Sequence, residues 1–323
     1  MKYLELKTKD PYFNLAVEEY LFDNSTEDVF MLWQNEPTVV IGRNQNVYAE
    51  VRLDEAGKNG VHIARRITGG GAVYHDGGNL NYTFISVNSQ GGIDFERFTS
   101  PVISALRSLG VDAKLGGRND IEVSGRKISG NAQCKRGNRV LHHGTLLFDS
   151  NLEFLSGILS VDEEKIKSKA IKSTRSRVAN LKELLPSLSN VDEFISLISE
   201  YVIRELSAER STLTVTPEIE RLRERNASDD WLFPSEGYLS SYSIKKKKRY
   251  PFGVVEVYLD MSNDVIKGAK ICGDFFGNGD ISELEALLSG KRLAELSDVF
   301  STFNINEYIF GMSVEEFLMH ILA

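Results

Sequence analysis

Cysteine is scarce in this chain: its 323 residues include only Cys134 and Cys272, and no pair has the spacing of a zinc site. Two thiols cannot build a disulfide framework, so a reducing compartment fits best. Long apolar runs are absent too, because no stretch approaches the 18 residues that a membrane span requires. The N-terminal segment also lacks the apolar centre of a signal peptide. We therefore expect a soluble, cytoplasmic protein.

Positive charge is in short supply as well. The chain has 38 Lys and Arg against 46 Asp and Glu, which gives a net charge of −8. General nucleic-acid binding needs an extended basic face that neutralises phosphates, so this balance argues against it and leaves room only for a local basic site. The composition, 41% hydrophobic and 26% charged, is that of ordinary globular proteins, and the length suggests about two domains.

The first 150 residues are rich in short β-like runs and contain few helices. A helix is predicted over 11–23, with Asp10 as N-cap and Pro11 as the first helical residue. Only the second half of 95–109 is predicted to be helical, ending before Gly110. The β-like runs lie at 28–34, 37–43, 60–66, 80–87, 120–123, 127–129 and 139–149. Hairpin signals join several of them, so we predict an α+β fold with a mixed or antiparallel sheet.

The rest of the chain is predicted to be mainly helical up to residue 240, with Thr216 and Pro217 opening one helix. The segment "DDWLFPSEGYLSSYSIKKKKRYPFG" is interpreted as a connection. A compact unit of two strands and three helices follows, and Ser313 with Glu316 forms a capping-box pattern in its last helix. We place the domain boundary near 245, which divides the chain into residues 1–244 and a small α+β domain of residues 245–323.

The most unusual stretch is "RRITGGGAVYHDGGNLNYTF". Glycines 69–71 can expose consecutive N–H groups that surround phosphate oxygens or a planar ring. Neighbouring strand residues point to opposite faces, so only one of Arg65 and Arg66 can reach such a ligand, while Asn79 and Asn81 share a face. A mobile hairpin would explain the glycines alone, but the polar flanks favour a ligand loop. No GK[ST] sequence or helix follows, so this is neither a Walker loop nor a dinucleotide fingerprint.

A second polar constellation is "GGRNDIEVSGRKISGNAQ". Lys127 comes just after a hairpin tip, and the small polar residues 129–133 follow where a strand would normally bury apolar groups. A solvated hairpin lysine is one reading; the other is a lysine that stabilises charge developing on a substrate carbonyl and a phosphate. Asn119 and Asp120 could hold Mg²⁺ on a nucleotide, which needs only one or two protein oxygens.

The sequence "HHGTLLFD" supplies a third candidate. On a strand, only one of His142 and His143 can face a common site, so a histidine metal cage is not predicted. Cys134 lies near the proposed site and could be an acyl-carrying nucleophile. No histidine base flanks it, however, and a structural thiol is the favoured reading.

These motifs, in this order and at this spacing, resemble the lipoate–protein ligase A family nearly from end to end. The resemblance is carried by "FNLAVEEYLF", "LWQNEPTVVIGRNQN", the glycine stretch, "GRNDIEVSGRKISGNAQ", "HHGTLLFD" and "IKSTRSRVANLKELL", and by the C-terminal unit. It implies a catalytic domain over 1–244 with the fold of biotin and lipoate ligases. It also implies an accessory domain over 245–323, thought to move between two half-reactions.

The resemblance implies an activity as well. Such enzymes use ATP, with Mg²⁺, to convert lipoate into lipoyl-AMP and pyrophosphate. They then transfer the lipoyl group to a lysine of an acceptor protein. Acceptors in the family are the lipoyl domains of 2-oxoacid dehydrogenase acyltransferases and the H protein of glycine cleavage.

Carried over residue by residue, the resemblance implies a site around the glycine stretch. Lys127 would be catalytic and would contact both the lipoyl carbonyl and the α-phosphate. ATP and lipoyl-AMP would be bound by Arg66, Gly69, Gly70, Gly71, Ala72, Val73, Tyr74, Asn79 and Lys127. Lipoate would be bound by Arg66, His75, Lys127 and His143, and Mg²⁺ by Asn119 and Asp120. Val17, Leu21 and Val40 are suggested for the apolar slot that holds the lipoyl chain.

Other readings remain open. An ATP-independent lipoyl or octanoyl transferase of the same fold would need a reactive cysteine and no accessory domain. A catalytically silent regulator is disfavoured by the presence of Lys127, and nothing matches the arginine–glycine loop of a biotin ligase. The lysine run 245–248 could steer an acidic acceptor or simply be solvated. Arg175 and Arg177 could clamp a ligand or pair with acids.

Overall fold

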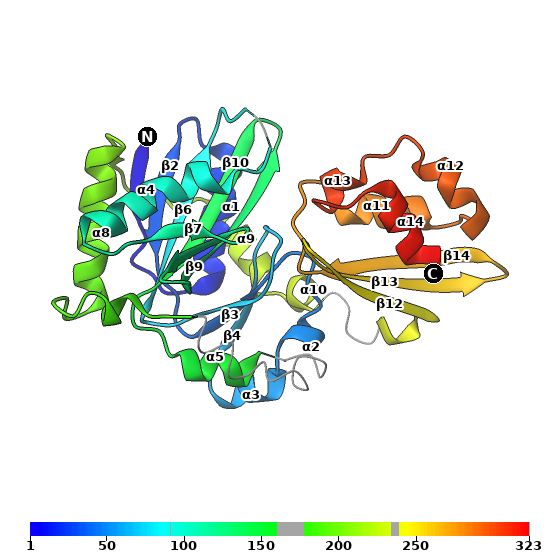
Figure 1. Cartoon of the computed structure of the whole chain (residues 1–323), viewed down its shortest axis with the longest axis horizontal. Coiled ribbons are helices and arrows are strands. Elements are labelled where there is room, and N and C mark those ends of the chain that lie inside the picture. The colour runs from blue at the N-terminus through cyan, green and yellow to red at the C-terminus, as the bar shows by residue number, and fades with distance from the viewer. Residues whose placement is uncertain (91, 160–177, 234–238, 323) are drawn as a thin grey trace.

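The largest element of the fold is a mixed eight-stranded sheet (Figure 1). The computed structural model describes residues 1–90, 92–159, 178–233 and 239–322; Arg175 and Arg177 lie outside these ranges. Strand β1 pairs in parallel with β2 and β11, and the other neighbours are antiparallel, so the predicted mixed sheet is confirmed. In spatial order the strands are β11 (Glu209–Arg210), β1 (Lys2–Glu5), β2 (Val29–Trp33), β6 (Asn79–Ser86), β10 (Arg139–Leu147), β9 (Arg126–Arg136), β8 (Asp120–Val123) and β7 (Lys114–Gly116).

A second, small sheet lies beside the large one. It contains β4 (His62–Arg65), β3 (Thr38–Ile41) and β5 (Val73–His75), with β3 in the centre. The short helices α2 (Val47–Glu50) and α3 (Leu53–Lys58) connect its first two strands. The chain then passes from the last strand of the small sheet into β6 of the large one within a few residues, which holds the two sheets close together.

Helices cover both faces of the large sheet. Helices α4 (Phe95–Ser108) and α8 (Val191–Glu205) pack on one face, and α1 (Pro11–Asn24) and α9 (Pro217–Asn226) pack on the other (Figure 1). The alternation of strand side chains follows this division. Leu80, Tyr82 and Phe84 belong to the core under α4 and α8, whereas Ile85 belongs to the core under α1.

The predicted end signals of the helices are largely confirmed. Asp10 accepts hydrogen bonds from the N–H groups of Tyr12 and Phe13, and Thr216 caps α9. Helix α4 is longer than predicted, because Asp94 caps it at Arg97 and its first half is helical as well. The sequence analysis missed the first half because Pro101 lies inside the helix, and proline usually ends or kinks a helix.

Hairpins form at both ends of β9, which confirms that hairpin signals join these β-like runs. Ser124 and Gly125 make the first turn with φ of 50° and 74°, and Gly137 makes the second with φ of 59°. Such positive φ values cost glycine nothing, which is why "SGR" and "KRGN" carry a turn signal. The strand between the turns runs over eleven residues, so its polar middle lies well inside the sheet.

The C-terminal unit is a three-stranded antiparallel sheet with helices on one side (Figure 1). Its strands are β12 (Ile244–Tyr250), β13 (Gly253–Ser262) and β14 (Val265–Gly273). The prediction that residues 244–250 belong to a connection is wrong, because the lysine run pairs with β13 as an edge strand. A lysine-rich sequence can do this at an edge, where half of the side chains face water. The capping box of Ser313 and Glu316 is confirmed.

The remaining elements complete these two bodies. In the large unit they are α5 (Leu152–Ile158), the 3-10 turn Leu181–Glu183 and α10 (Asp229–Leu232). In the C-terminal part they are the 3-10 turns Leu239–Ser241 and Leu293–Glu295 and the helices α11 (Ile281–Leu288), α12 (Leu296–Phe300), α13 (Ile305–Tyr308) and α14 (Val314–Leu322). Within the described ranges, no helix combines the length and the apolar character needed to cross a membrane.

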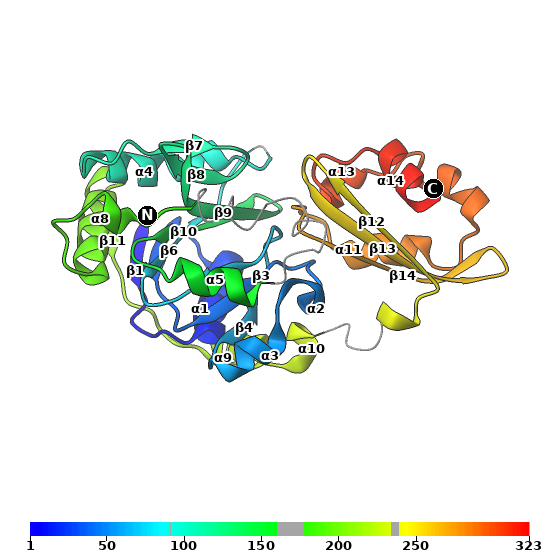
Figure 2. The ribbon, with the colours of Figure 1, turned by 60° about the horizontal axis from the view of Figure 1, so that its bottom comes forward.

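The C-terminal unit touches the large unit at the end of β14 (Figure 2). The N–H of Gly273 donates to the carbonyl of Asn44 over 2.8 Å, and that of Gly70 donates to Phe275 over 3.1 Å. An exposed ion pair joins Arg43 to Asp280 at 2.9 Å. The unit has a core of its own, drawn from residues 250–321, and the division near residue 245 stays a prediction.

His142 is a polar residue that packs in the apolar core under α4. Its ring stacks on Phe98 and Tyr82, with centroids 5.3 Å and 6.1 Å away, and is fully buried. Neither ring nitrogen has a hydrogen-bond partner among the described residues. Burial, together with the neighbouring His143, lowers the pKa of His142 to about 3, so the ring is neutral in the folded protein.

This burial predicts an acid-dependent loss of stability. Between the unfolded pKa near 6.5 and the folded pKa near 3, the unfolded chain binds a proton at His142 that the folded chain does not. The free energy of unfolding should therefore fall as the pH is lowered, and His142→Leu should remove about 1.4 kcal/mol per pH unit of that slope. Urea unfolding between pH 7 and pH 4 measures the slope, with His62→Gln as control. An unchanged slope in His142→Leu would contradict the prediction.

Candidate ligand-binding pocket

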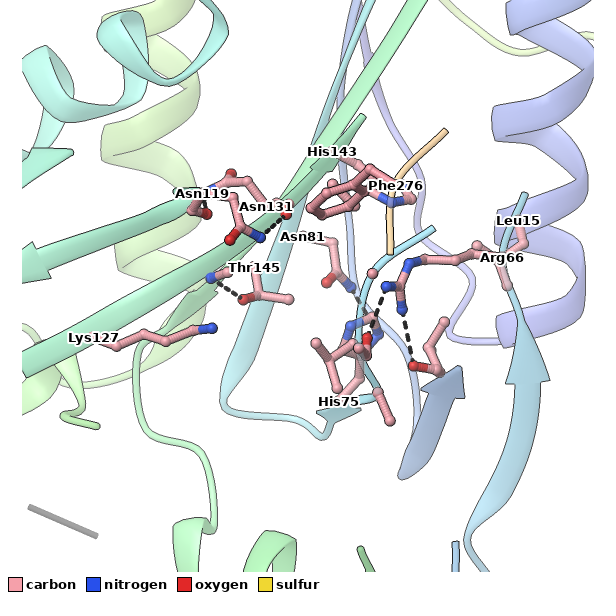
Figure 3. A pocket seen from close by; sticks show the side chains of 18 of the residues that line it. Leu15, Arg66, His75, Asn81, Asn119, Lys127, Asn131, His143, Thr145 and Phe276 are labelled. Atoms are coloured by element: carbon pink, nitrogen blue, oxygen red, sulfur yellow. Dashed lines mark hydrogen bonds between the residues drawn. The ribbon is translucent and has the colours of Figure 1, made fainter. Parts of the chain in front are cut away.

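A pocket lies where the small sheet meets the α1 face of the large sheet. Its walls come from β3, β5 and the glycine loop on one side and from β6, β9 and β10 on the other. Figure 3 shows Arg66 and Lys127 entering from opposite sides, with His75 and Asn81 between them. Apolar lining is contributed by Leu15, Trp33, Val40, Ala72, Val73, Ala132 and Phe276.

Arg66 holds the glycine loop around itself. Its guanidinium is buried and donates to the carbonyls of Gly69 over 2.7 Å, Gly71 over 2.8 Å and Val40 over 3.1 Å. Nε donates to the hydroxyl of Thr68 over 3.0 Å. Four of the five N–H donors of an arginine are thus used on the protein. Burial lowers the pKa of Arg66 to about 10, which still leaves a full positive charge in the pocket wall at neutral pH.

Arg65 also binds main-chain carbonyls, but on the opposite face of its strand. It donates to the carbonyls of Gly42, Arg43 and Gln45 and to those of Trp231 and Leu232, over 2.7 to 3.2 Å. The expectation that the two arginines point apart is therefore confirmed. Arg65 ties the loop after β3 to helix α10, and Arg66 faces the pocket.

A buried carboxylate on α1 continues the network behind Arg66. Glu18 accepts from His143 Nδ1 over 2.8 Å and from the hydroxyl of Thr83 over 2.7 Å. His143 Nε2 lies 2.8 Å from the Thr68 hydroxyl that Arg66 also contacts. Glu18 is only 1% exposed, and its carboxylate is stabilised inside the protein by these two hydrogen bonds and by the positive charge of Arg66.

Lys127 extends from β9 at the rim of the pocket. Its ammonium lies 2.7 Å from Asp120 Oδ1, in a pair whose side chains are about one-third exposed. The main chain at Lys127 is held too, because its carbonyl accepts from the N–H of Ala179 over 2.9 Å. Asn119 and Asn131 tie β9 to the loop before β8, since the N–H of Asn131 donates to the carbonyl of Asn119 over 2.9 Å.

Phe276 of the C-terminal unit contributes to the lining of the pocket. Its ring lies under the guanidinium of Arg118, 4.6 Å from the ring centroid, and against Phe95, with centroids 5.5 Å apart. The backbone of the same segment occupies the glycine loop, because the carbonyl of Phe275 accepts from the N–H of Gly70. One N–H of the triglycine is therefore already bonded within the chain.

The structure brings most of the predicted residues to the pocket. Nine of them line it: Arg66, Gly70, Gly71, Ala72, Val73, His75, Asn119, Lys127 and His143. Gly69 lies under Phe275, Tyr74 packs against Phe154, Asn79 donates to Asn81, and Asp120 is paired with Lys127. Of the suggested apolar residues, Val40 lines the pocket, whereas Val17 and Leu21 pack in the core around α1. Their parts in binding stay predictions.

Several residues of the site were missed by the sequence analysis. Trp33 and Leu15 carry no signal that separates them from core residues, and Phe276 lies about 200 residues from the glycine loop. Glu18 had a usable signal, since it interrupts the buried stretch of a helix with a charge that needs a partner.

Cys134 does not have the properties of a nucleophile. Its side chain is buried with the apolar residues around α1, and burial raises the pKa of its thiol to about 12. A thiol that stays protonated in an apolar environment is unreactive. This favours the structural reading of Cys134 over the acyl-carrying one.

Comparison with known protein families identifies the family to which this chain belongs. Residues 10–203 match the profile of the lipoyl protein ligase A/B catalytic domain, and residues 240–321 match that of the bacterial lipoate protein ligase C-terminus. The chain belongs to the lipoyl protein ligase A/B family. The resemblance drawn from its motifs is thus confirmed.

Relatives of known structure or name support this membership. The chain is 40% identical to lipoate-protein ligase LplJ of Bacillus subtilis, over 96% of both chains. It is similar to a bipartite lipoate protein ligase of Thermoplasma acidophilum, with 30% identity, a TM-score of 0.65 and coverage of 75% and 98% of the two chains. For a lipoate-protein ligase A bound with ATP the values are 29%, 0.61, 72% and 98%. LipL1 of P. falciparum, at 24% identity, shares the fold over 99% of both chains with a TM-score of 0.80.

The glycine loop generates a prediction about the docking of Phe275 and Phe276. A Cβ at Gly69 would lie 2.3 Å from the carbonyl oxygen of Phe275, whereas a Cβ at Gly71 would meet nothing within 4 Å. Gly69→Ala should therefore displace the segment, and hydrogen exchange at Gly273 and Gly70 should become at least about tenfold faster. Gly71→Ala is the matched control. Equal exchange in the two variants would show that the segment is not held by this contact.

Proposed function

We propose that this chain is an ATP-dependent lipoate–protein ligase. The observation that carries the proposal is the convergence of two cations, Arg66 and Lys127, on a pocket that is also lined by apolar side chains. Such a pocket suits a molecule with an anionic end and an apolar chain. Lipoate has this form, and the family membership and the named relatives agree with it.

The first half-reaction joins the two substrates. A carboxylate oxygen of lipoate attacks the α-phosphorus of ATP, the bond to the β-phosphate oxygen breaks, and lipoyl-AMP and pyrophosphate are formed. Negative charge develops on the phosphate oxygens during this step. Lys127 can stabilise it once its ammonium leaves Asp120, while Arg66 keeps a fixed positive charge in the wall behind.

The second half-reaction uses the same cations. The ε-amine of an acceptor lysine attacks the acyl carbon and an oxyanion forms. As it collapses, the bond between the acyl carbon and the AMP oxygen breaks, AMP leaves, the nitrogen loses a proton to water, and an amide bond remains. We infer that Lys127 stabilises this oxyanion, because its side chain lines the pocket and is about one-third exposed.

The apolar part of the wall is proposed to hold the lipoyl chain. Trp33, Leu15 and Val40 come from β2, the helix α1 and β3, so three rigid elements define its shape. Burying the methylene groups of a bound acid against them would contribute about 0.8 kcal/mol for each group.

Mg²⁺ is proposed to accompany ATP at Asp120 and Asn119. The carboxylate of Asp120 contacts Lys127, which lines the pocket, and Asn119, another lining residue, adds an amide. This small donor set fits an ion that takes most of its ligands from phosphates and water. The described residues contain no cluster of three or more His, Cys, Asp or Glu that could hold a metal by themselves. When bound, Mg²⁺ would neutralise phosphate charge.

The acceptors are proposed to be lipoyl domains of 2-oxoacid dehydrogenase acyltransferases, the H protein of glycine cleavage, or both. The Thermoplasma acidophilum relative was studied together with its E2 lipoyl domain, which supports this class of partner. The proposed alternative, an ATP-independent transferase, would need a reactive thiol, and the buried Cys134 does not supply one.

Pyrophosphate exchange into ATP, measured with purified protein and no acceptor, tests the function. A ligase should catalyse exchange that depends on lipoate. Folded protein that binds lipoate but shows no exchange would contradict adenylation by this chain. Transfer from a lipoylated donor protein without ATP would then identify a transferase.

Lys127→Gln should lower lipoate-dependent exchange by at least about 100-fold, because the uncharged amide cannot stabilise the developing charge. Arg126→Gln is the matched control. Arg126 is the preceding residue of β9 and forms a surface ion pair with Glu183, so its loss should leave the rate within about twofold. Comparable rates in Lys127→Gln and the wild type would remove Lys127 from the mechanism.

A further inference from the structure

Asn35 lies behind the pocket wall and contacts His75, a lining histidine. Among the described residues, one ring nitrogen of His75 has hydrogen-bond partners and the other has none. The side-chain Nδ2 of Asn35 is 3.1 Å from His75 Nδ1, and both residues are buried. His75 Nε2 has no hydrogen-bond partner among the described residues, although the ring lines the pocket. The chemistry of His75 therefore depends on what Asn35 presents to Nδ1.

Main-chain carbonyls fix the orientation of this contact. The Nδ2 of Asn14 lies 2.8 Å from the carbonyl of Gln34 and 3.2 Å from that of Thr8, so this atom must be the nitrogen of the amide. The same Nδ2 lies 3.0 Å from Asn35, which must therefore present its oxygen to Asn14. The other end of the Asn35 amide, which faces His75, is then an N–H donor.

A second amide agrees with this assignment. Asn79 donates to Asn81 Oδ1 over 2.8 Å, and Asn81 turns its Nδ2 toward His75 Nδ1, at 3.4 Å. Nδ1 is thus approached by donors alone and must be an acceptor. In a neutral imidazole the proton then resides on Nε2.

We propose that Asn35 is a positioning residue that fixes His75 as the neutral Nε2–H tautomer, so that His75 donates one hydrogen bond to an anionic oxygen of the bound ligand. The oxygen belongs either to the carboxylate of the acid or to a phosphate of ATP; the inference relies on the proposed function only for these two identities. His75 is one of the residues that line the pocket, and a ligand oxygen at its Nε2 would supply the acceptor that the described residues do not.

The surroundings keep the imidazole neutral. Burial, the positive Arg66 and the neighbouring His143, which is bonded to Glu18, act on the ring, and the pKa of His75 is lowered to about 3. Trp33 packs edge-on against it, with centroids 5.9 Å apart. A neutral donor adds directionality without a third positive charge beside Arg66 and Lys127.

The first test reads the tautomer directly and needs neither ligand nor activity. The chain has five histidines, so long-range ¹H–¹⁵N correlation of the ¹⁵N-labelled full chain, assigned with His75→Gln, resolves each ring. We expect a non-protonated Nδ1 and a protonated Nε2 at His75, unchanged from pH 5.5 to 8.5. A protonated Nδ1 in the wild type would overturn the proposal, whatever the enzyme does.

The second test reverses the contact with Asn35→Asp, which keeps the acceptor for Asn14 but presents a carboxylate to Nδ1. The ring should now carry Nδ1–H and titrate within this pH range, losing its Nε2 proton as the pH rises. Affinity for the ligand that His75 contacts should then fall about tenfold or more between pH 6 and 8.5, while the wild type stays flat. Asn59→Asp, the same change at an exposed position, is the control.

Calorimetric titration with lipoate alone and with ATP alone separates the two sources of the oxygen. A pH-dependent loss for lipoate only assigns the carboxylate, and a loss for ATP only assigns a phosphate. Parallel pH profiles of Asn35→Asp and wild type for both ligands would overturn the proposed bond. Pyrophosphate exchange is not needed for either test, so failure of this inference and failure of the ligase function are distinguishable.

Discussion

The buried guanidinium of Arg66 is the constraint on which the rest of the site depends. A charge without water must be surrounded by acceptors, and the glycine loop supplies them by turning the carbonyls of Gly69 and Gly71 inward. A side chain at Gly70 would obstruct this curl, because Gly70 has a φ of 89° and its Cβ would lie 3.1 Å from the Arg66 guanidinium. The loop is therefore glycine-rich in order to wrap an arginine as much as to approach a ligand.

The same guanidinium links the pocket to the elements around it. Through Thr68 it reaches His143, and through His143 it reaches Glu18 on α1. Glu18 in turn holds Thr83, to which Trp33 donates. A polar network thus runs from the glycine loop to the apolar end of the pocket. The groups that would contact the anionic and the apolar parts of the proposed ligand are therefore connected to one another.

The part of the pocket lining that comes from the C-terminal unit is held differently from the network around Arg66. Phe276 and the carbonyl of Phe275 come from a unit with its own core. Individual hydrogen bonds, an exposed ion pair and ring contacts join that unit to the larger one. The N–H of Gly70 is bonded to Phe275 in this structure, at a position where the sequence suggested a ligand oxygen. Contacts of this kind can be exchanged at little cost, whereas those of Arg66 cannot.

Local sequence signals predicted much of the fold because they act over a few residues. The Asp10 cap, the turns at Gly125 and Gly137 and the alternation along β6 depend only on neighbours in the chain. Strand β12 was missed because its partner β13, and not its lysine-rich composition, makes it a strand. The start of α4 was missed because Pro101 masks a helix that Asp94 caps.

The sequence by itself determined the chemical groups of the site: two arginines that must point apart, a triglycine that can curl, and a lysine after a hairpin. Alternation along a strand and backbone sterics decide these matters locally. Only the tertiary structure decided which atoms the groups meet. Arg66 faces carbonyls of its own loop, Glu18 reaches the pocket through His143, and Phe276 arrives from the C-terminal unit. Burial and long-range pairing set these contacts, and neither is encoded in a short stretch of chain.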